Sequence, residues 1–205
     1  MNGYPVPAQT IRVETRVANS RFITTVGPAE TVDKARAFIS AIRRELPDAT
    51  HHVYAFKIGY GSSVIEGMSD DGEPAGTAGP PVLSVLRGAD LGDVVMVVTR
   101  YFGGTKLGTG GLVRAYGSAA QTALEALPRA RKVLEHTIGL EFPYPYYERI
   151  QQLLEKHEAR VREQEFSTDI TLYATIPVDR LDKFTAEIQE LTAGQVSPIL
   201  LDEQE

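Results

Sequence analysis

Segments with strand periodicity and segments with helical periodicity alternate along the first two thirds of the chain. Residues 10–17 alternate apolar and polar side chains, which is typical of a strand with one buried face. Residues 94–99 are a continuous, mostly β-branched run, which predicts a strand buried on both faces. The whole pattern predicts two hairpins separated by a helix, then a short helix, the buried strand and a long helix. The predicted ranges are strands 10–17 and 21–26, helix 32–45 with Thr31 or Asp33 as its cap, strands 51–58 and 63–67, helix 80–86 with Thr77 as its cap, strand 94–99 and helix 109–127.

The last third of the chain has a different order of patterns. Its apolar residues predict a strand, a helix, two strands, a helix and a strand, which is the βαββαβ order of a ferredoxin-like sandwich. The boundary near 129–133 gives an N-terminal domain over 1–130 and a C-terminal domain over 131–205, in a protein of the α+β class. The predicted ranges are strand 134–142, helix 146–157, strands 160–166 and 169–176, helix 179–191 and strand 195–201.

Two glycine-rich segments lie directly before predicted helices. The first is Ser69-Asp-Asp-Gly-Glu-Pro-Ala-Gly-Thr-Ala-Gly79, and the second is Arg100-Tyr-Phe-Gly-Gly-Thr-Lys-Leu-Gly-Thr-Gly-Gly-Leu-Val-Arg114. Glycine lets the backbone approach a ligand closely, and the free N–H groups at a helix N-terminus attract anions. Neither segment has the GxxxxGK[ST] pattern, so a nucleotide-hydrolysing P-loop is not expected.

Charge is distributed unevenly along the 205 residues, whose formal net charge is −6. Residues 99–132 carry six basic side chains and one acidic side chain, whereas residues 133–205 carry six basic and fifteen acidic ones. The acidic stretch favours a protein partner over RNA, because negative charge repels phosphate. Residues 99–132, in contrast, form a basic island in the sequence. Its basic residues are Arg100, Lys106, Arg114, Arg129, Arg131 and Lys132.

The composition indicates the cellular compartment and excludes several classes of cysteine chemistry. The sequence contains no cysteine, which excludes disulfides, thiolate nucleophiles and cysteine metal sites. It contains no run of about 18 apolar residues, and its first residues lack the basic-then-apolar pattern of a signal peptide. We therefore expect a cytoplasmic protein without a membrane partner.

The two glycine-rich segments, with the second extended to 97–117, resemble those of the Impact/YigZ family. Shorter matches at 20–23 and 49–55 support the resemblance, which covers nearly the whole chain. It implies an N-terminal domain of the ribosomal protein S5 domain 2-like fold and a ferredoxin-like C-terminal domain similar to domain V of elongation factor G. Two positions depart from the family pattern. Val53 stands where relatives often have cysteine, and Pro80 stands where they often have a basic residue.

The resemblance also implies a function connected with translation. Eukaryotic relatives regulate translation during amino-acid starvation by binding a partner of the kinase that senses uncharged tRNA. Bacterial members have been suggested to bind nucleic acid or the translation machinery. The implied partners are therefore the translation machinery or one of its regulatory proteins, with RNA as a candidate. The resemblance carries no established reaction, cofactor or oligomeric state.

The favoured hypothesis is a non-catalytic protein that regulates translation and binds through the basic, glycine-rich face of its N-terminal domain. Cations in this segment suit phosphate, and Tyr101, Phe102 and Tyr116 offer flat surfaces on which bases stack. The predicted binding residues are Arg100, Tyr101, Gly103, Gly104, Lys106, Gly108, Gly110, Gly111 and Arg114.

Two alternatives stay open. In a structural alternative, Arg100 and Arg114 pair with acidic residues of the first segment, Phe102 and Tyr116 are core residues, and the glycines form a rigid junction. In an enzymatic alternative, a small anionic substrate binds in a preformed pocket between the two segments, with a carboxylate of the first segment as general base. A metal site formed with His51 and His52 has no supporting spacing, so no metal, cofactor or catalytic residue is assigned. The acidic loop of the family motif comprises Asp70, Asp71, Gly72, Glu73, Gly76, Thr77 and Gly79.

Overall fold

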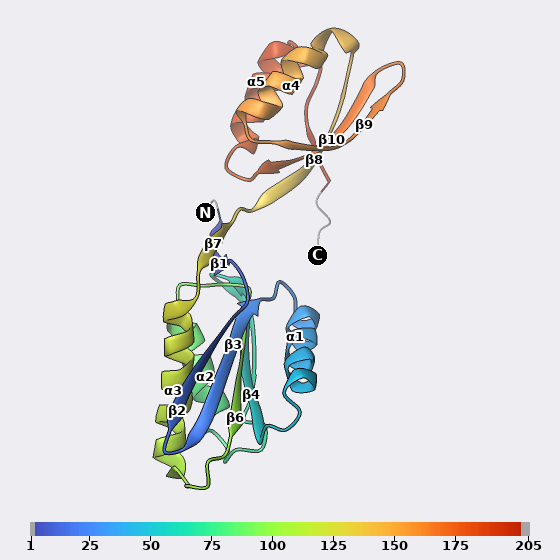
Figure 1. Cartoon of the computed structure of the whole chain (residues 1–205). Helices are drawn as coiled ribbons and strands as arrows, with labels where there is room; N and C mark the ends of the chain where they lie inside the picture. The colour runs from blue at the N-terminus through green and yellow to red at the C-terminus, as the bar shows by residue number, and fades with distance from the viewer. Residues whose placement is uncertain (1–2, 202–205) are drawn as a thin grey trace. The chain divides into compact units, whose positions relative to one another are not determined.

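The structure, a computed structural model, describes residues 3–201 and divides into two units, one formed by Tyr4–Lys132 and the other beginning at Val133. In the first unit, a five-stranded antiparallel sheet of order β2-β3-β6-β4-β5 carries α1 on one face and α2 and α3 on the other (Figure 1). Its elements are β1 (Tyr4–Pro7), β2 (Ile11–Val17), β3 (Ser20–Pro28), α1 (Val32–Glu45), β4 (His51–Tyr60), β5 (Ser63–Ser69), α2 (Gly79–Gly88), β6 (Val94–Tyr101), α3 (Gly108–Ala126) and β7 (Arg129–Lys132).

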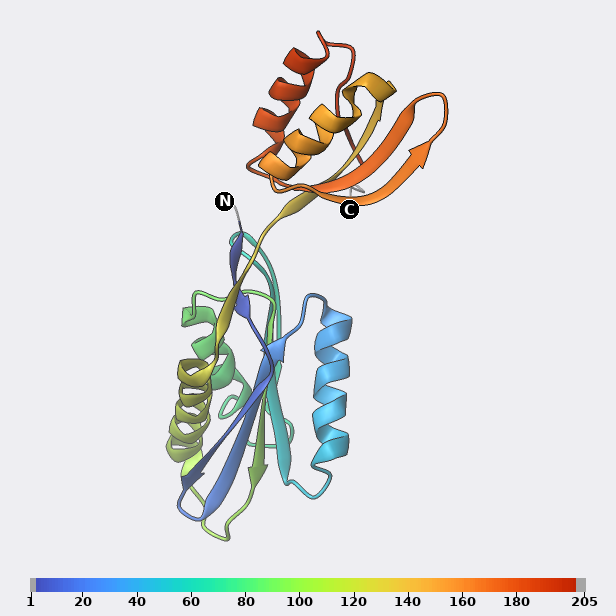
Figure 2. The ribbon, with the colours of Figure 1, turned by 45° about the horizontal axis from the view of Figure 1, so that its top comes forward.

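The continuous apolar run of the sequence forms the central strand of this sheet. β6 lies between β3 and β4, and every residue from Val94 to Arg100 is buried. Val95 and Val97 pack in the core under α1. Val94, Met96 and Val98 point to the opposite face and pack in the core under α2 and α3. Figure 2 shows the two helical layers on opposite faces of the sheet. The prediction of a strand buried on both faces is confirmed.

A two-stranded ribbon, which the sequence analysis does not predict, lies at the ends of the first unit, and one of its strands falls at the predicted domain boundary. β1 pairs with β7 in antiparallel register, with Tyr4 opposite Lys132. Buried Asp93 anchors the ribbon: its carboxylate accepts hydrogen bonds from the Lys132 ammonium at 2.5 Å and from the Tyr4 hydroxyl at 2.8 Å. The same carboxylate accepts a bond from the Gly59 N–H at 2.8 Å, which ties the ribbon to β4.

The second unit is a four-stranded sheet of order β11-β8-β10-β9, with α4 and α5 side by side on one face (Figure 1). This βαββαβ order and sheet order confirm the ferredoxin-like prediction. Ile150 and Phe184 of the helices are fully buried against Ile138 and Leu172 of the strands. The elements are β8 (Glu135–Phe142), a 3-10 turn (Tyr144–Tyr146), α4 (Tyr147–Lys156), β9 (Arg160–Phe166), β10 (Ile170–Pro177), α5 (Leu181–Leu191) and β11 (Ile199–Leu200).

The last strand is shorter than its predicted range of 195–201. The Thr192 hydroxyl accepts a hydrogen bond from the Val196 N–H at 3.1 Å, and Gly194 has a φ of +79°. These local bonds hold Val196 in a loop after α5, where it is buried in the core without belonging to a strand. An apolar residue that packs from a loop therefore imitates strand periodicity in the sequence.

Candidate functional site

The two glycine-rich segments meet at one end of the five-stranded sheet. The first follows β5 and the second follows β6, and both strands pair with β4, placing Ser69 opposite Tyr54 and Arg100 opposite His51. α2 then begins at Gly79 and α3 begins at Gly108. The prediction that each segment leads into a helix is confirmed, and the sheet pairing brings the two helix N-termini to the same end.

Asp70, and not Thr77, caps α2. Its Oδ1 accepts hydrogen bonds from the N–H groups of Ala78 and Gly79 at 2.9 and 2.8 Å, and its Oδ2 accepts one from Gly76 at 2.9 Å. The Thr77 hydroxyl instead donates to the Pro74 carbonyl at 2.6 Å. The prediction that Thr77 caps α2 is therefore wrong. The chain turns back after Asp70, so that the carboxylate of this earlier residue reaches the N-terminus of α2.

Replacement of Asp70 by alanine is expected to lower the free energy of unfolding by about 2 kcal/mol, because three backbone N–H groups lose their acceptor. Burial raises the pKa of Asp70, but the bonds from Gly76, Gly79 and Ala78 outweigh it and the pKa is lowered. The stabilisation is thus present above the unfolded pKa of about 3.9 and is lost as pH falls through the folded pKa. Urea unfolding at several pH values tests this. An Asp70→Asn control keeps one acceptor oxygen, so a loss as large as that of alanine would contradict the capping role.

The second acidic residue of the loop is held by a different set of partners. Asp71 pairs with the Arg43 guanidinium and accepts a bond from the His52 N–H at 2.6 Å. Its backbone has a φ of +46°, and its carbonyl lies 2.8 Å from His51 Nδ1. Asp70 and Asp71 are thus both fixed by structural contacts, which leaves neither placed as a free general base.

A buried ion pair joins the two glycine-rich segments. The Arg100 guanidinium donates from Nη1 to Glu73 Oε1 at 2.5 Å, and the two side chains are only 5% and 4% exposed. The Tyr116 hydroxyl of α3 donates to the same oxygen at 2.7 Å. Burial is the main cause that raises the pKa of Tyr116, and the hydrogen bond to Glu73 raises it further. Arg100 Nη2 also donates to Ser20 Oγ at 3.3 Å. The structural alternative is correct for Arg100 and Tyr116.

A pocket of about 340 Å³ opens beside this ion pair, between the two glycine-rich segments. Glu73 and Pro74 contribute from the first segment, and all other lining residues belong to the second segment or the start of α3. The sequence did not single out Pro74, Leu107 or Thr109; the only available signal was their position directly beside the glycines. The lining residues are Glu73, Pro74, Arg100, Phe102, Lys106, Leu107, Gly108, Thr109 and Leu112.

The predicted binding residues fall into two groups in the structure. Arg100 is buried and paired, so its prediction as a surface phosphate contact is wrong: the guanidinium is needed to neutralise Glu73. Phe102 is 47% exposed, so the alternative that makes it a core residue is also wrong. Within residues 3–201, Lys106 and Arg114 are exposed and make no ion pair. Tyr101, Gly103 and Gly111 are half-buried, whereas Gly104, Gly108 and Gly110 are exposed.

Two of the glycines are required by packing. A Cβ on Gly103 would lie 2.1 Å from the Asn19 backbone, and one on Gly79 would lie 2.9 Å from the Ser69 backbone. A side chain at position 103 would push the second segment away from the turn between β2 and β3, and one at position 79 would push the start of α2 away from the end of β5. Gly110 differs, because a Cβ there would meet no atom within 4 Å among the described residues. Tight packing at Gly79 and Gly103 therefore makes part of the two glycine-rich segments a rigid structural junction.

The basic island of the sequence is not one patch. α3 separates Lys106 from Arg129, and its 19 residues span about 28 Å. Lys132 is bound to Asp93, and Arg129 Nη1 donates to the Asp90 carbonyl at 3.5 Å. The cations at the pocket end are therefore Lys106 and Arg114 alone among the island residues, with Arg100 buried behind them.

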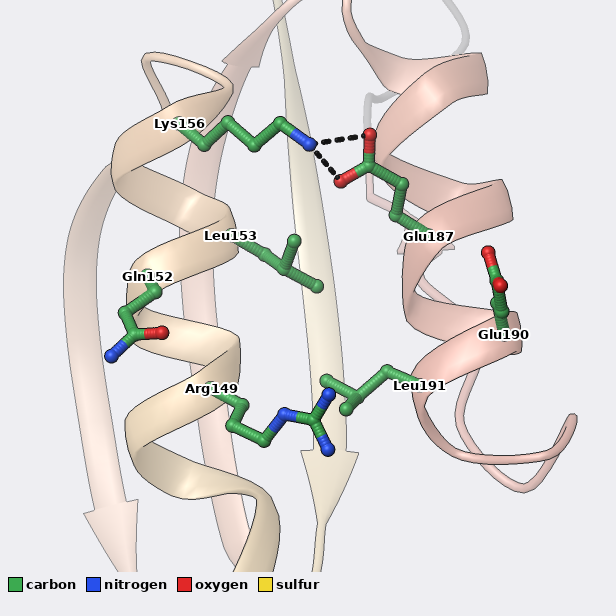
Figure 3. A pocket seen from close by; sticks show the side chains of 7 residues that line it. All are labelled: Arg149, Gln152, Leu153, Lys156, Glu187, Glu190 and Leu191. Atoms are coloured by element: carbon green, nitrogen blue, oxygen red, sulfur yellow. Dashed lines mark hydrogen bonds and ion pairs between the residues drawn. The ribbon is translucent and has the colours of Figure 1, made fainter.

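A larger hollow of about 750 Å³ lies on the outer surface of the second unit, between α4 and α5. Figure 3 shows the Lys156 ammonium reaching across it to both oxygens of Glu187, at 2.9 and 2.7 Å. Leu153 and Leu191 form its floor, and charged side chains of both signs surround it. Lys156 and Glu187 neutralise each other across this groove, so it is the weaker candidate for a site.

The described residues contain neither a metal cluster nor a membrane-spanning helix. Among residues 3–201, no group of three or more His, Asp or Glu side chains is placed to hold a metal ion. In the same range, no helix combines the length and the apolar character needed to cross a membrane. The pocket between the glycine-rich segments is therefore the candidate site.

Comparison with known proteins matches both units. The Impact N-terminal domain matches residues 18–124, and a domain of unknown function, DUF1949, matches residues 140–195. An IMPACT family member of Haemophilus influenzae is 40% identical over 98% of both chains, and IMPACT family member YigZ of Escherichia coli is 35% identical over 99% of this chain and 100% of that protein. A crystal structure of a hypothetical protein covers 100% of both chains with a TM-score of 0.76 and 35% identity. With full-length relatives above 30% identity and both domains matched, the chain belongs to the IMPACT family.

Proposed function

We propose that the protein is a non-catalytic binding protein of the translation apparatus that contacts RNA at the pocket end of its N-terminal unit. The connection with translation rests on family membership. The mode of contact rests on the surface around the start of α3, where Lys106 and Arg114 provide positive charge and Phe102 provides an exposed ring. Arg100 takes no part in this surface, because it is held by Glu73.

One observation carries the proposal: the N-terminus of α3 has no side-chain cap, and its first residues line a pocket together with Phe102 and Lys106. Leu107 occupies the cap position without a side-chain hydrogen bond, and the first turn holds no acidic residue. The first N–H groups of a helix need acceptors, and a phosphate oxygen is a suitable one. Lys106 precedes this turn and Phe102 lines the same pocket, which adds a cation and a stacking surface.

In the enzymatic alternative a pocket lies in the expected place, but each of the three carboxylates of the first segment is held by other groups. Asp70 caps α2, Asp71 binds Arg43 and the His52 N–H, and Glu73 is paired with Arg100 and Tyr116. A general base must be able to accept a proton from the substrate, which these contacts oppose. The geometry therefore favours binding over catalysis.

The salt dependence of RNA binding tests the proposal. Phosphate contacts release counterions, so the affinity of the wild type for a single-stranded RNA should fall steeply with salt concentration. Lys106→Ala and Arg114→Ala should each weaken binding and reduce the slope of log K against log salt by about 1. Arg44→Ala removes the same charge from α1, on the other face of the sheet, and should leave the slope unchanged. RNA binding that is absent at low salt, or equal in all four proteins, would overturn the proposal.

A further inference from the structure

The pocket has the size and wall chemistry of a small-ligand site. Its volume of about 340 Å³ is at the lower end of the range found for small-molecule sites, which suits one compact ligand. Phe102, Leu107 and Leu112 supply apolar walls, with Pro74 from the opposite segment. Because the Phe102 ring is 47% exposed within an otherwise packed junction, one aromatic face is available to a planar group.

A buried polar group in the wall lacks a partner. The Arg100 side chain lines the pocket while being only 5% exposed, and its Nε makes no hydrogen bond to any residue in 3–201. The Arg100 guanidinium also lies over the Phe102 ring at 5.5 Å. Buried N–H groups without acceptors are uncommon in folded proteins. The pocket wall therefore contains, next to the Phe102 ring, a buried guanidinium whose charge is balanced by Glu73 but whose Nε–H has no acceptor among the described residues.

The rim of the pocket suits an anionic group. Gly108 and Thr109 begin α3 and line the pocket together with Lys106. Gly110 follows in the same turn, where neither a positive φ nor close packing requires glycine. Glycine disfavours helices, but here it leaves the backbone N–H groups of the first turn uncovered. An anion at this position would meet backbone donors and the Lys106 ammonium.

We propose that this pocket binds a single nucleotide, with the base in the apolar part against Phe102 and the phosphate at the N-terminus of α3 beside Lys106. The inference rests on the proposed function and specifies its chemistry, because the nucleotide is either a free nucleoside monophosphate or the phosphorylated end of an RNA. A planar, polar base fits an aromatic wall that also contains a buried cation, and such bases stack on aromatic rings and arginine planes.

Titrations of the isotope-labelled full chain, followed by amide chemical shifts, test the inference. The probes are the four nucleoside 5′-monophosphates, the matching nucleosides, and one RNA oligonucleotide with and without a 5′-phosphate. At least one monophosphate should shift the amides of 102–112 in a saturable way, and its nucleoside should bind at least about tenfold more weakly. A preference of at least about tenfold for the phosphorylated oligonucleotide over that monophosphate identifies an RNA end as the ligand, and the reverse order identifies a free nucleotide.

Three variants locate the binding. Phe102→Ala should weaken nucleotide binding at least about fivefold, whereas Phe102→Tyr keeps a stacking ring and should bind like the wild type. Gly110→Ala covers the first turn of α3 and should weaken binding, although it favours the helix and should not lower the melting temperature. Gly117→Ala, at a second open position of the same helix, is the matched control and should bind normally.

The outcomes separate this inference from the proposed function. If no monophosphate or phosphorylated end shifts the amides of 102–112, the nucleotide pocket is wrong, even when salt-dependent RNA binding through Lys106 is observed. Equal binding by the Gly110→Ala and Gly117→Ala variants would also overturn it. If a monophosphate binds as expected but no RNA binds at low salt, the pocket is supported and the RNA function is rejected.

Discussion

Replacement of Glu73 by alanine is expected to lower the free energy of unfolding by about 3–5 kcal/mol, because it leaves a buried Arg100 without its counter-charge. The pair is almost fully buried, at 4% and 5% exposure, so water cannot replace the lost carboxylate. The Tyr116 hydroxyl, which is also buried, loses its acceptor in the same variant. Equilibrium unfolding in urea, followed by circular dichroism, measures the change.

An exposed ion pair provides the control for this prediction. Glu66 of β5 pairs with Arg87 of α2 at 2.7 Å, but both side chains are considerably more exposed than the buried pair. Glu66→Ala should therefore have a much smaller effect, since exposed pairs contribute little. Glu73→Gln keeps the shape and an acceptor oxygen, so it should be milder than Glu73→Ala. Similar losses for Glu66→Ala and Glu73→Ala would contradict the view that a buried charge holds the two segments together.

Replacement of Asp93 by alanine is expected to lower the free energy of unfolding by about 3 kcal/mol. The buried carboxylate accepts bonds from Lys132, Tyr4 and the Gly59 N–H, and an alanine side chain offers none of these three donors an acceptor. Asp93 also has a φ of +49°, which alanine adopts less readily than aspartate or asparagine. Asp93→Asn removes the charge but tolerates this backbone conformation, so it should lower the free energy of unfolding by less than Asp93→Ala does.

The Asp93 prediction includes a pH dependence. Burial raises the pKa of Asp93, but the bonds from Lys132, Gly59 and Tyr4 outweigh it, and the pKa is lowered. A lowered folded pKa means that the stabilisation is complete above the unfolded pKa of about 3.9 and disappears as pH falls through the folded value. Urea unfolding between pH 6 and pH 2.5 should show a smaller loss of stability in Asp93→Asn than in the wild type. Parallel curves for the two proteins would refute the role of the charge.

The sequence predicts well those features whose cause is local. The run from Val94 to Thr99 identifies the central strand because a two-sided burial requires apolar residues at every position. Of the two caps predicted for α1, Thr31 and Asp33, the structure has Thr31, whose hydroxyl accepts from the Lys34 N–H at 3.1 Å only three residues away. Features that depend on distant partners were missed. β1 and β7 form a ribbon because segments more than a hundred residues apart meet, and neither four-residue strand has a pattern of its own.

The candidate site shows the same limit. Its location was predictable, because glycine-rich segments before helices mark where backbones converge. The role of each charge was not, because it depends on which side chains the sheet register brings together. Arg100 looks in the sequence like any other cation of the island, and only its position opposite His51, beneath Glu73, turns it into a buried structural residue.

The β1–β7 ribbon also brings the two ends of the N-terminal unit together, since Tyr4 is paired with Lys132. A domain whose ends are adjacent can be circularly permuted or inserted as a cassette into a loop of another protein. A short linker from Lys132 to Tyr4, with new ends at the exposed turn of Gly61 and Ser62, would keep every strand pair of the five-stranded sheet. The order of elements along the chain is thus separable from the architecture that forms the pocket.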